Sequence, residues 1–216
     1  MTVNLKNRIY TSIVMIILLF LMTINNFIFC YFLIIAGIVS ILEFFKIIII
    51  IFAKNKIKKL LLNLLFTLYI FSLFSFILVM TSFLHLKILI FLILVTCVFS
   101  DIGGYVFGKI FKGPKLTKIS PNKTISGSFG SLLFSVTFIS VATYYLTGSF
   151  DYNILIVGFT TTIGCQVGDL FFSFLKRKSF MKDTGNFLPG HGGILDRIDG
   201  MLLGVPTGFL TLLVIY

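Results

Sequence analysis

The sequence predicts an all-α polytopic membrane protein, a bundle of about seven transmembrane helices whose N-terminus is cytoplasmic. Three observations predict this class. Of the 216 residues, 58% are hydrophobic and 12% are charged, which is more apolar than the core of a soluble domain of this length requires. Apolar runs of about 20 residues, the length that crosses a bilayer, recur along the chain. Basic residues gather in every second gap between these runs, as the positive-inside rule expects of cytoplasmic loops.

Seven runs are long enough to span a membrane, and they cover residues 8–25, 27–46, 60–80, 86–108, 127–147, 153–175 and 198–216. The first run follows Lys6 and Arg8 as in a signal peptide, but no small-residue cleavage site follows it, so we expect a retained span. The second run continues through residues 47–52, after the charged Glu43 and Lys46. Residues 47–52 either lengthen that span or lie in the membrane interface as a short helix.

The lysines and arginines orient these spans. All eighteen except Lys46 and Lys87 lie before the first span or after the second, fourth and sixth spans. The N-terminus and the loops 109–126 and 176–198 are therefore expected in the cytoplasm, and the C-terminus outside. The net charge of +11 also suits nucleic-acid binding. Basic residues beside apolar runs more often report topology and contact with anionic lipid, so we expect no nucleic-acid partner.

Several isolated polar residues are expected to be structural. We expect Glu43 to pair with Lys46, and His85 lies in a predicted external loop. The cysteines each lie inside an apolar run without metal-type spacing, which favours buried packing residues and implies no disulfide framework: Cys30, Cys97 and Cys165.

Two carboxylates lie at membrane depth, Asp101 in the fourth span and Asp169 in the sixth. Each precedes by about two helical turns the lysine that ends its span, Lys109 or Lys176. An ionised carboxylate in a bilayer is costly unless it is paired, hydrated or metal-bound, so we expect both to face the bundle interior. They either bind a metal or a substrate, or form interhelical ion pairs with lysines.

A polar island at residues 173–199 follows the sixth span and is the candidate site. A stripe of polar residues spaced i, i+3, i+7 and i+10 on one helical face leads to it: Gln166, Asp169, Ser173 and Lys176. The island combines cations, carboxylates and a glycine-rich turn, the groups that a polyphosphate–metal site needs: Lys176, Arg177, Lys178, Lys182, Arg197, Asp183, Asp196, Asp199 and residues 189–193.

The carboxylates of this region predict a magnesium site. Asp196 and Asp199 are three residues apart and share a face at the mouth of the last span if the chain is helical there. Asp169 and Asp196 would then converge on a divalent cation, with Asp199 and Asp101 as further candidate ligands. Oxygen ligands together with phosphate suit Mg²⁺.

The loop between the fourth and fifth spans contains a second candidate motif, Ser120-Pro-Asn-Lys-Thr124. Its hydroxyls, its backbone N–H groups and Lys123 suit an anion beside the start of the fifth span. The alternative is an ordinary positive-inside loop, but Asp101 just before it favours a functional loop. Gly103, Gly104 and Gly108 upstream would allow close helix packing.

The island reads S-x-x-K-R-x₄-K-D-x₅-P-G-H-G-G-x-x-D-R-x-D, which resembles the signature of the phosphatidate cytidylyltransferases, also called CDP-diacylglycerol synthases. Gln166-x-Gly-Asp169 and Ser120-Pro-x-Lys-Thr124 also resemble this family. Ser126 departs from it, because members commonly carry Glu or Gln there. The resemblance covers about residues 97–216 and implies a catalytic region there, with residues 1–96 as a scaffold of transmembrane helices in a single domain.

The resemblance implies that CTP and phosphatidic acid react to give CDP-diacylglycerol and pyrophosphate, with Mg²⁺, in the inner cell membrane, facing the cytoplasm, as a homodimer. It implies catalytic roles for Lys176, Arg177, Lys182, Asp183, His191 and Arg197. It implies substrate contacts for Ser120, Lys123, Thr124, Ser173, Gly190, Gly192 and Gly193. The implied metal ligands are Asp169, Asp196, Asp199 and Asp101. For His191, a hydrogen-bonding or acid role and a purely structural one are both open.

Other functions remain as alternatives. A CTP-dependent membrane lipid kinase would release CDP rather than form a CDP-lipid. CDP-archaeol synthases are related but lack the P-G-H-G-G element, and the D-G-x-x-A-R motif of the CDP-alcohol phosphotransferases is absent. An ion-coupled transporter would use Asp101 and Asp169 as coupling sites, but it does not explain the glycine-rich turn.

Overall fold

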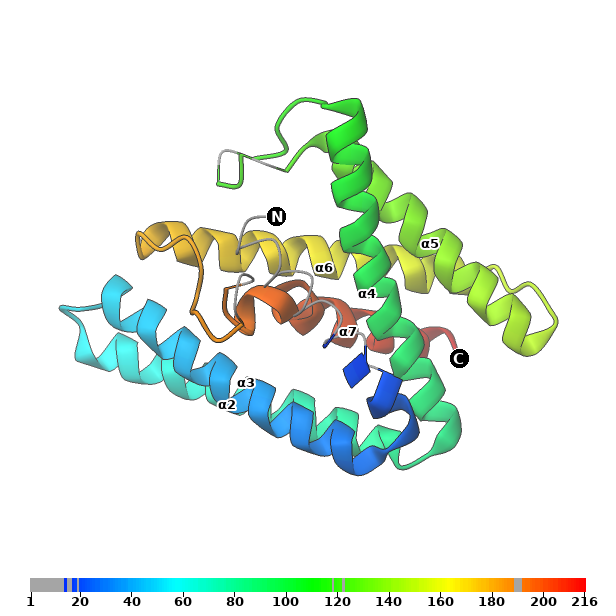
Figure 1. Ribbon diagram of the computed structural model, residues 1–216, viewed down its shortest axis with the longest axis horizontal. Helices are drawn as coiled ribbons and strands as arrows, with labels where there is room; N and C mark the ends of the chain where they lie inside the picture. The colour runs from blue at the N-terminus through cyan, green and yellow to red at the C-terminus, as the bar shows by residue number, and fades with distance from the viewer. Residues whose placement is uncertain (1–13, 15–16, 19, 118, 122, 189–191) are drawn as a thin grey trace. The chain divides into compact units, whose positions relative to one another are not determined.

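The computed structural model describes residues 14, 17–18, 20–117, 119–121, 123–188 and 192–216. This part of the chain is helical and contains no strand, only two isolated β-bridges. Its long helices, labelled in Figure 1, are α2 (Asn26–Ile51), α3 (Lys56–Thr81), α4 (Leu84–Phe111), α5 (Ile125–Thr147), α6 (Asn153–Lys178) and α7 (Leu195–Ile215).

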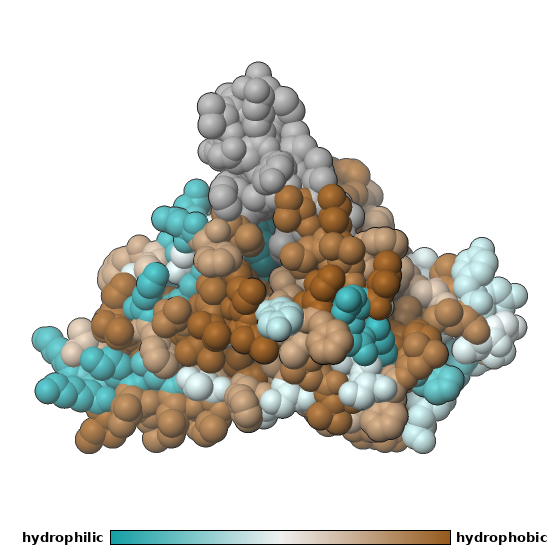
Figure 2. Space-filling model, turned by 60° about the horizontal axis from the view of Figure 1, so that its bottom comes forward, coloured by the Kyte–Doolittle hydropathy of each residue, from teal (hydrophilic) through white to brown (hydrophobic). Residues whose placement is uncertain are grey.

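Each of these six helices is long and apolar enough to cross a membrane, which confirms the predicted all-helical, multi-pass membrane protein. Many large apolar side chains are exposed, and brown apolar residues cover much of the face drawn in Figure 2. Lipid rather than water suits such a surface. The predicted first span, residues 8–25, lies mostly outside the described residues, and residues 20–24 are helical.

The run after Glu43 is one continuous helix. Helix α2 extends through residues 47–51 without a break, and Ile47 and Ile48 are fully buried. The alternative of a separate short helix is therefore wrong. Asn25 and Asn55 cap α2 and α3 by accepting the N–H groups of Phe27 and Lys58, which satisfies donors that a helix start leaves free.

The chain divides into two compact units. The first contains residues up to Phe83 together with Leu175–Ile198, and the second contains Leu84–Phe174 together with Asp199–Tyr216. Helices α6 and α7 each contribute residues to both units. This division concerns packing, so the expected separation of roles at residues 96/97 stays a prediction.

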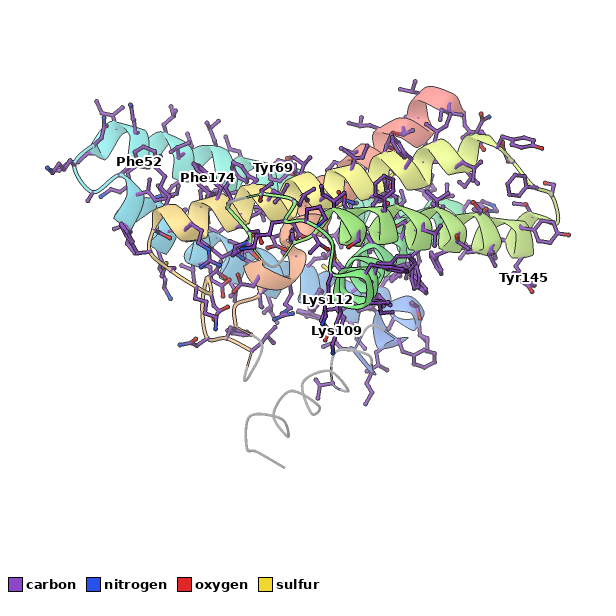
Figure 3. The ribbon with its side chains drawn as sticks, turned by 90° about the horizontal axis from the view of Figure 1, so that it is seen from above. Phe52, Tyr69, Lys109, Lys112, Tyr145 and Phe174 are labelled. Carbon is purple, nitrogen blue, oxygen red and sulfur yellow. The ribbon has the colours of Figure 1, made fainter. Side chains whose placement is uncertain are left out.

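In the first unit, α2 and α3 pack together as a hairpin. The rings of Phe44 and Phe66 stack with their centroids 3.8 Å apart. At the end of α2, the ammonium of Lys178 lies 5.6 Å from the centre of the Phe52 ring. Figure 3 labels Phe52 there. The hairpin presents Glu43, a carboxylate on α2, to the interior of this unit, where it is 3% exposed.

In the second unit, α4 and α5 run antiparallel and cross at two glycines. A Cβ on Gly103 would lie 2.4 Å from the carbonyl oxygen of Gly130, so neither position has room for a side chain. Ser131 on α5 donates to the carbonyl of Ser100 on α4 at 2.8 Å. Figure 3 labels Lys109 and Lys112 at the end of α4 and Tyr145 near the end of α5. The crossing fixes two of the three helices that line a cavity in this unit.

Candidate functional site

The second unit contains a cavity of about 180 Å³. Four segments line it: α4, the loop after it, α5 and α6. The lining residues are Ser100, Asp101, Gly104, Tyr105, Leu116, Lys123, Thr124, Gly127, Ser128, Ser131, Gln166 and Asp169. The structure thus brings together two predicted metal ligands, Asp101 and Asp169, and two predicted substrate contacts, Lys123 and Thr124.

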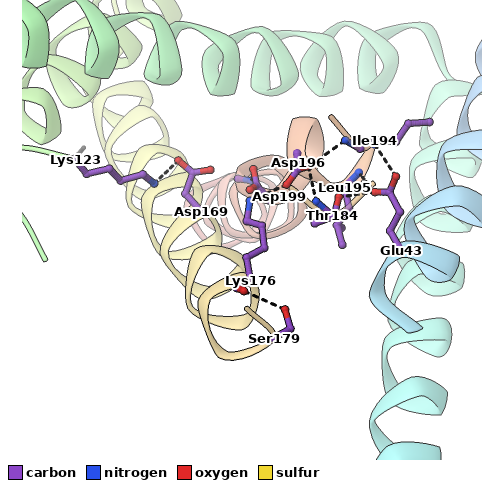
Figure 4. A network of polar contacts seen from close by, with 12 residues as sticks. Glu43, Lys123, Asp169, Lys176, Ser179, Thr184, Ile194, Leu195, Asp196 and Asp199 are labelled. Carbon is purple, nitrogen blue, oxygen red and sulfur yellow. Dashed lines mark hydrogen bonds and ion pairs between the residues drawn. The ribbon is translucent and has the colours of Figure 1, made fainter. Parts of the chain in front are cut away.

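An ion pair joins the two motifs that the sequence singles out around this cavity. The ammonium of Lys123 lies 2.6 Å from Oδ2 of Asp169, as Figure 4 shows. The side chains are 31% and 25% exposed, so both groups remain partly accessible from the cavity. Asp169 therefore does pair with a lysine, as the alternative reading of the sequence allowed, but this lysine lies in the loop before α5 and not on a helix. The pair also places a cation and a carboxylate together in one cavity.

The loop before α5 holds Lys123 in place. The N–H of Leu116 donates to the carbonyl of Lys123 at 2.8 Å, and the N–H of Lys123 donates to the carbonyl of Ser120 at 3.0 Å. Thr124 is the N-cap of α5, and its hydroxyl accepts the N–H of Gly127 at 3.1 Å. Lys123 is thus fixed between a turn and a capped helix, and its side chain extends to α6.

Ser120 does not line the cavity. Its N–H donates to the hydroxyl of Thr117 at 3.3 Å, inside the same loop. Ser126, where the resemblance leads one to expect Glu or Gln, accepts the N–H of Gly113 at 3.3 Å. These two residues shape the loop rather than the cavity wall.

Gln166 lines the cavity with a polar side chain, although it was not among the predicted site residues. Its side-chain oxygen accepts the hydroxyl of Ser128, and its amide nitrogen donates to the carbonyl of Ser128 at 3.1 Å. Both partners line the cavity, as does Ser131. Gln166 belongs to the polar stripe that ends at Lys176, so the sequence held a signal for it. Ser128 and Ser131 are small residues within an apolar span and carried no such signal.

A match to a family model decides the family. The model described as the cytidylyltransferase family matches residues 6–215. The chain belongs to this family. Among its cytidylyltransferase relatives, the protein named phosphatidate cytidylyltransferase from Mycobacterium leprae is 40% identical over 114 residues, 52% of this chain and 36% of that protein.

Two other relatives carry the same name. The one from Helicobacter pylori is 43% identical over 113 residues, 52% of this chain and 42% of that protein. The one from Rickettsia bellii is 40% identical over 117 residues, 50% of this chain and 51% of that protein. The chain spans about half or less of the length of these cytidylyltransferases.

A second polar centre lies in the first unit, around Asp196 in the first turn of α7. Its Oδ1 accepts the ammonium of Lys176 at 2.8 Å, and the two side chains are 13% and 8% exposed. Its Oδ2 accepts the N–H groups of Thr184 and Gly193 at 2.8 and 3.0 Å. A carboxylate that receives N–H groups at a helix start caps that helix and satisfies free donors.

The remaining residues of the predicted island divide by exposure. Five of the charged side chains are exposed at the surface: Arg177, Lys178, Lys182, Asp183 and Arg197. Ser173 is half-buried. Gly192 has a positive φ of 86°, a conformation that glycine adopts without strain, and its carbonyl accepts the N–H of Leu188 at 2.9 Å. Gly190 and His191 lie outside the described residues.

Glu43 does not pair with Lys46 as the sequence predicted. Its carboxylate instead accepts the hydroxyl of Thr184 and the N–H groups of Ile194 and Leu195, as Figure 4 shows. Spacing along α2 favoured Lys46 because the two residues lie about one turn apart. The true partners lie 141 to 152 residues away, a separation at which periodicity carries no signal.

The carboxylates of the cavity fit a magnesium ion. Asp101 and Asp169 line it together with hydroxyl and amide oxygens, and Mg²⁺ in phosphate sites takes one or two carboxylates, substrate phosphate and water. Asp199 is 8% exposed, and its Oδ1 accepts the N–H of Gly200, beside Asp169. No group of three or more His, Cys, Asp or Glu side chains is arranged for a metal among the described residues. Asp196 belongs to the other unit, so its convergence with Asp169 stays a prediction.

Proposed function

We propose that this protein transfers the cytidylyl group of CTP to phosphatidic acid, giving CDP-diacylglycerol and pyrophosphate in phospholipid biosynthesis. The observation that carries the proposal is the cavity in which Lys123 and Asp169 meet beside Asp101 among membrane-length helices. A polar, charged cavity of this kind suits a lipid phosphate whose acyl chains stay in the bilayer. Membership of the cytidylyltransferase family, with relatives named phosphatidate cytidylyltransferase, supports the choice of CTP.

The proposed reaction needs positioning and charge neutralisation more than activation. A phosphate oxygen of phosphatidic acid forms a bond to the α-phosphorus of CTP, and the bond from that phosphorus to the bridging oxygen of the β-phosphate breaks. Pyrophosphate leaves with the electron pair, and no oxidation or reduction takes place. Because the nucleophile is already an anion, no Ser-His-Asp arrangement is needed, and the barrier falls through orientation and electrostatic stabilisation.

The chain's own cations supply that stabilisation in the proposal. Lys123 binds a phosphate oxygen in the cavity while Ser128, Ser131 and Gln166 orient it through hydrogen bonds. The island cations neutralise the triphosphate and the lipid headgroup: Lys176, Arg177, Lys182 and Arg197. The other residues keep the substrate-contact or catalytic roles that the resemblance implies: Ser120, Thr124, Ser173, Asp183, Gly190, His191 and Gly192. Gly193 is the exception, because its N–H already donates to Asp196.

In this proposal Asp169 and Asp101 hold Mg²⁺, with Asp196 and Asp199 as the further ligands that the resemblance implies. Such an ion supplies charge neutralisation on the nucleotide phosphates and on the departing pyrophosphate. We also place the protein in the inner membrane, with the site facing the cytoplasm, where CTP is available, and we propose a homodimer. The positive-inside distribution of lysines and arginines supports the orientation.

The proposal is tested with CTP labelled at the α-phosphate, phosphatidic acid and Mg²⁺, using protein purified in detergent and thin-layer chromatography of the lipid. We expect a labelled CDP-lipid from the wild type, and a loss of about 10²- to 10³-fold for Asp169→Asn, the scale of removing one preorganised electrostatic group. Asp151→Asn is the matched control, because Asp151 is a carboxylate on the α5–α6 turn, away from the cavity lining.

Two results would overturn the proposal. One is the absence of any labelled lipid with the wild-type protein. The other is label transfer from γ-labelled CTP instead of α-labelled CTP, which is the product pattern of a lipid kinase. Full Mg²⁺-dependent activity in Asp169→Asn would remove Asp169 from the metal site while leaving the reaction in place.

A further inference from the structure

Glu43 is a buried carboxylate on α2 with only 3% of its surface exposed. A carboxylate in such a place is costly unless donors satisfy it. Its Oε2 accepts the hydroxyl of Thr184 at 2.7 Å and the N–H of Leu195 at 2.8 Å, and its Oε1 accepts the N–H of Ile194 at 3.2 Å. All three partners donate, which matches a carboxylate that accepts at both oxygens.

The three donors lie on both sides of the glycine-rich turn, in the α6–α7 loop (residues 179–194) and at the start of α7. Thr184 lies early in this loop, while Ile194 ends it and Leu195 begins α7. One side chain from α2 therefore fixes both ends of the segment that carries the glycine-rich turn. Thr184 and Leu195 are 1% and 0% exposed, so this attachment lies in the interior of the first unit.

Two glycines of the loop make room for this carboxylate. A Cβ added at Gly185 would lie 2.5 Å from Oε1 of Glu43, and one added at Gly193 would lie 2.4 Å from Oε2. Real Cβ atoms do not approach so closely, so a side chain at either position would displace the carboxylate. Gly193, assigned to substrate by the resemblance, thus has a packing reason to be glycine.

Glu43 also reaches Asp196 through one shared residue. The hydroxyl of Thr184 donates to Glu43, and its backbone N–H donates to Oδ2 of Asp196. Oδ1 of Asp196 in turn accepts the ammonium of Lys176. A chain of contacts therefore runs from α2 through Thr184 to Asp196 and Lys176, as Figure 4 shows.

The carboxylates of Glu43 and Asp196 already accept the N–H groups at the start of α7. The N–H groups of Ile194 and Leu195 bind Glu43, and the N–H of Gly193 binds Asp196. A helix N-terminus favours a negative charge, and here Glu43 supplies it from within the protein. These three N–H groups therefore hold the loop, and phosphate would be met by the exposed cations beside it.

We infer that Glu43 is a positioning residue that holds the α6–α7 loop, and through Thr184 the Asp196–Lys176 pair, in the arrangement used for catalysis. This inference rests on the proposed function for its catalytic part, because Glu43 itself is buried and acts through Thr184. Its structural part, the attachment of the loop to α2, is tested without any substrate.

The first test is hydrogen–deuterium exchange on the purified full chain in detergent, comparing wild type with Glu43→Gln. The glutamine keeps one acceptor oxygen but turns an NH₂ group toward donors, so Thr184, Ile194 and Leu195 cannot all remain bonded. We expect the amides of Ile194 and Leu195, which donate to Glu43, to exchange about ten-fold faster or more, together with the Thr184 amide as the loop loosens, and α4 and α5 to be unchanged. Ser40→Ala is the matched control, because Ser40 is buried one turn away on α2 and its hydroxyl has no hydrogen-bond partner.

The second test measures steady-state kinetics for the proposed reaction. We expect Glu43→Gln to lower kcat by about 10²-fold with a smaller change in KM, the scale of a misplaced catalytic group. Thr184→Val should lower kcat in the same way and Thr184→Ser should restore it. The double variant Glu43→Gln/Thr184→Val should be little worse than either single change, since both break one contact.

The outcomes separate the two hypotheses. Unchanged exchange at Thr184, Ile194 and Leu195 in Glu43→Gln overturns the inference, whatever the activity. Faster exchange with unchanged kcat overturns the catalytic part. A wild-type protein that forms no CDP-lipid overturns the proposed function, while the exchange result still decides whether Glu43 holds the loop.

Discussion

Replacing Gly130 by alanine should separate α4 from α5 and disable the cavity between them. An added Cβ would lie 2.3 Å from Cβ of Phe107 and 2.6 Å from the carbonyl oxygen of Gly103. Ordinary contacts of this kind begin near 3.4 Å, so the helices must move apart by about 1 Å, because a backbone atom cannot turn away. Overpacking of this kind costs about 1–3 kcal/mol of unfolding free energy, or more where the backbone is involved.

The same movement should reduce activity, because both helices line the cavity. Ser100 and Asp101 precede the crossing on α4, and Ser128 and Ser131 flank it on α5. A displacement of about 1 Å in positioning groups costs about 10²-fold in rate. We therefore expect Gly130→Ala to lower both the thermal midpoint in detergent and the rate of CDP-lipid formation.

The control for this variant is Gly37→Ala on α2. Its added Cβ would lie 3.2 Å from the ring of Phe74, a flexible side chain that can shift, and alanine has the higher helix propensity by about 1 kcal/mol. We expect no loss of stability from it. If Gly130→Ala unfolds and reacts like the wild type, the close α4–α5 crossing described above is incorrect.

Three further predictions follow from single contacts. In a double-mutant cycle of kcat/KM, the effects of Lys123→Met and Asp169→Asn should not add, because each removes one side of the same 2.6 Å ion pair. Strict additivity would contradict that coupling. Thr124→Ala should cost about 1 kcal/mol of unfolding free energy as a lost N-cap and should also raise KM for CTP, whereas Thr124→Ser should behave like the wild type in both assays. The Tyr216 hydroxyl and then the Asn153 N–H hold the pKa of Asp151 below its usual range, so Tyr216→Phe should raise that pKa. An NMR titration of the Asp151 carboxyl group measures the change, and an unchanged pKa would show that the hydroxyl does not reach it.

The contribution of the Asp151–Tyr216 contact to folding stability also depends on pH. Burial, and then the hydrogen bond to Asp151, raise the pKa of Tyr216 to about 12. The favourable contribution of Tyr216 to folding stability therefore persists at neutral pH and is lost as pH rises through that value. The lowered pKa of Asp151 acts in the other direction, because its contribution is lost as pH falls through the folded-state pKa. Absorbance of the tyrosinate during alkaline titration, with Tyr216→Phe as the reference, reports the first effect.

Local chemistry explains which features the sequence predicted. Apolar runs of membrane length located the helices because only a helix satisfies its backbone within lipid. Asp101 and Asp169 were found because carboxylates in such runs are costly, and the structure places both at one cavity. Lys123 was found through its turn, which does form, closed by a 3.0 Å hydrogen bond to Ser120.

The contacts that sequence reasoning missed depend on distant packing. Glu43 was assigned to its neighbour Lys46, yet its donors come from the α6–α7 loop. Gln166 and Ser128 pair across 38 residues, and nothing in either helix alone indicates the other. Gly193 was predicted to belong to a glycine-rich turn that approaches phosphate, whereas in the structure it gives the carboxylate of Glu43 close access to the backbone.

Two lysine–carboxylate ion pairs, one in each unit, predict that Mg²⁺ and CTP bind cooperatively in the proposed reaction. In both pairs a lysine neutralises a helix carboxylate: Lys123 with Asp169 at 2.6 Å and Lys176 with Asp196 at 2.8 Å. In the proposed reaction each lysine would leave its carboxylate for phosphate, and the carboxylate would bind the cation. Binding CTP alone leaves the carboxylate uncompensated, and binding Mg²⁺ alone leaves the lysine uncompensated, so neither step is favourable by itself. Coupling of this kind is reciprocal, so Mg²⁺ should tighten CTP binding by the factor by which CTP tightens Mg²⁺ binding. Calorimetric titration of CTP with and without Mg²⁺ measures this factor, typically 5- to 150-fold. Asp169→Asn should reduce it, because an amide neither needs the lysine nor holds the cation as strongly. An unchanged factor in that variant would show that Asp169 takes no part in the exchange.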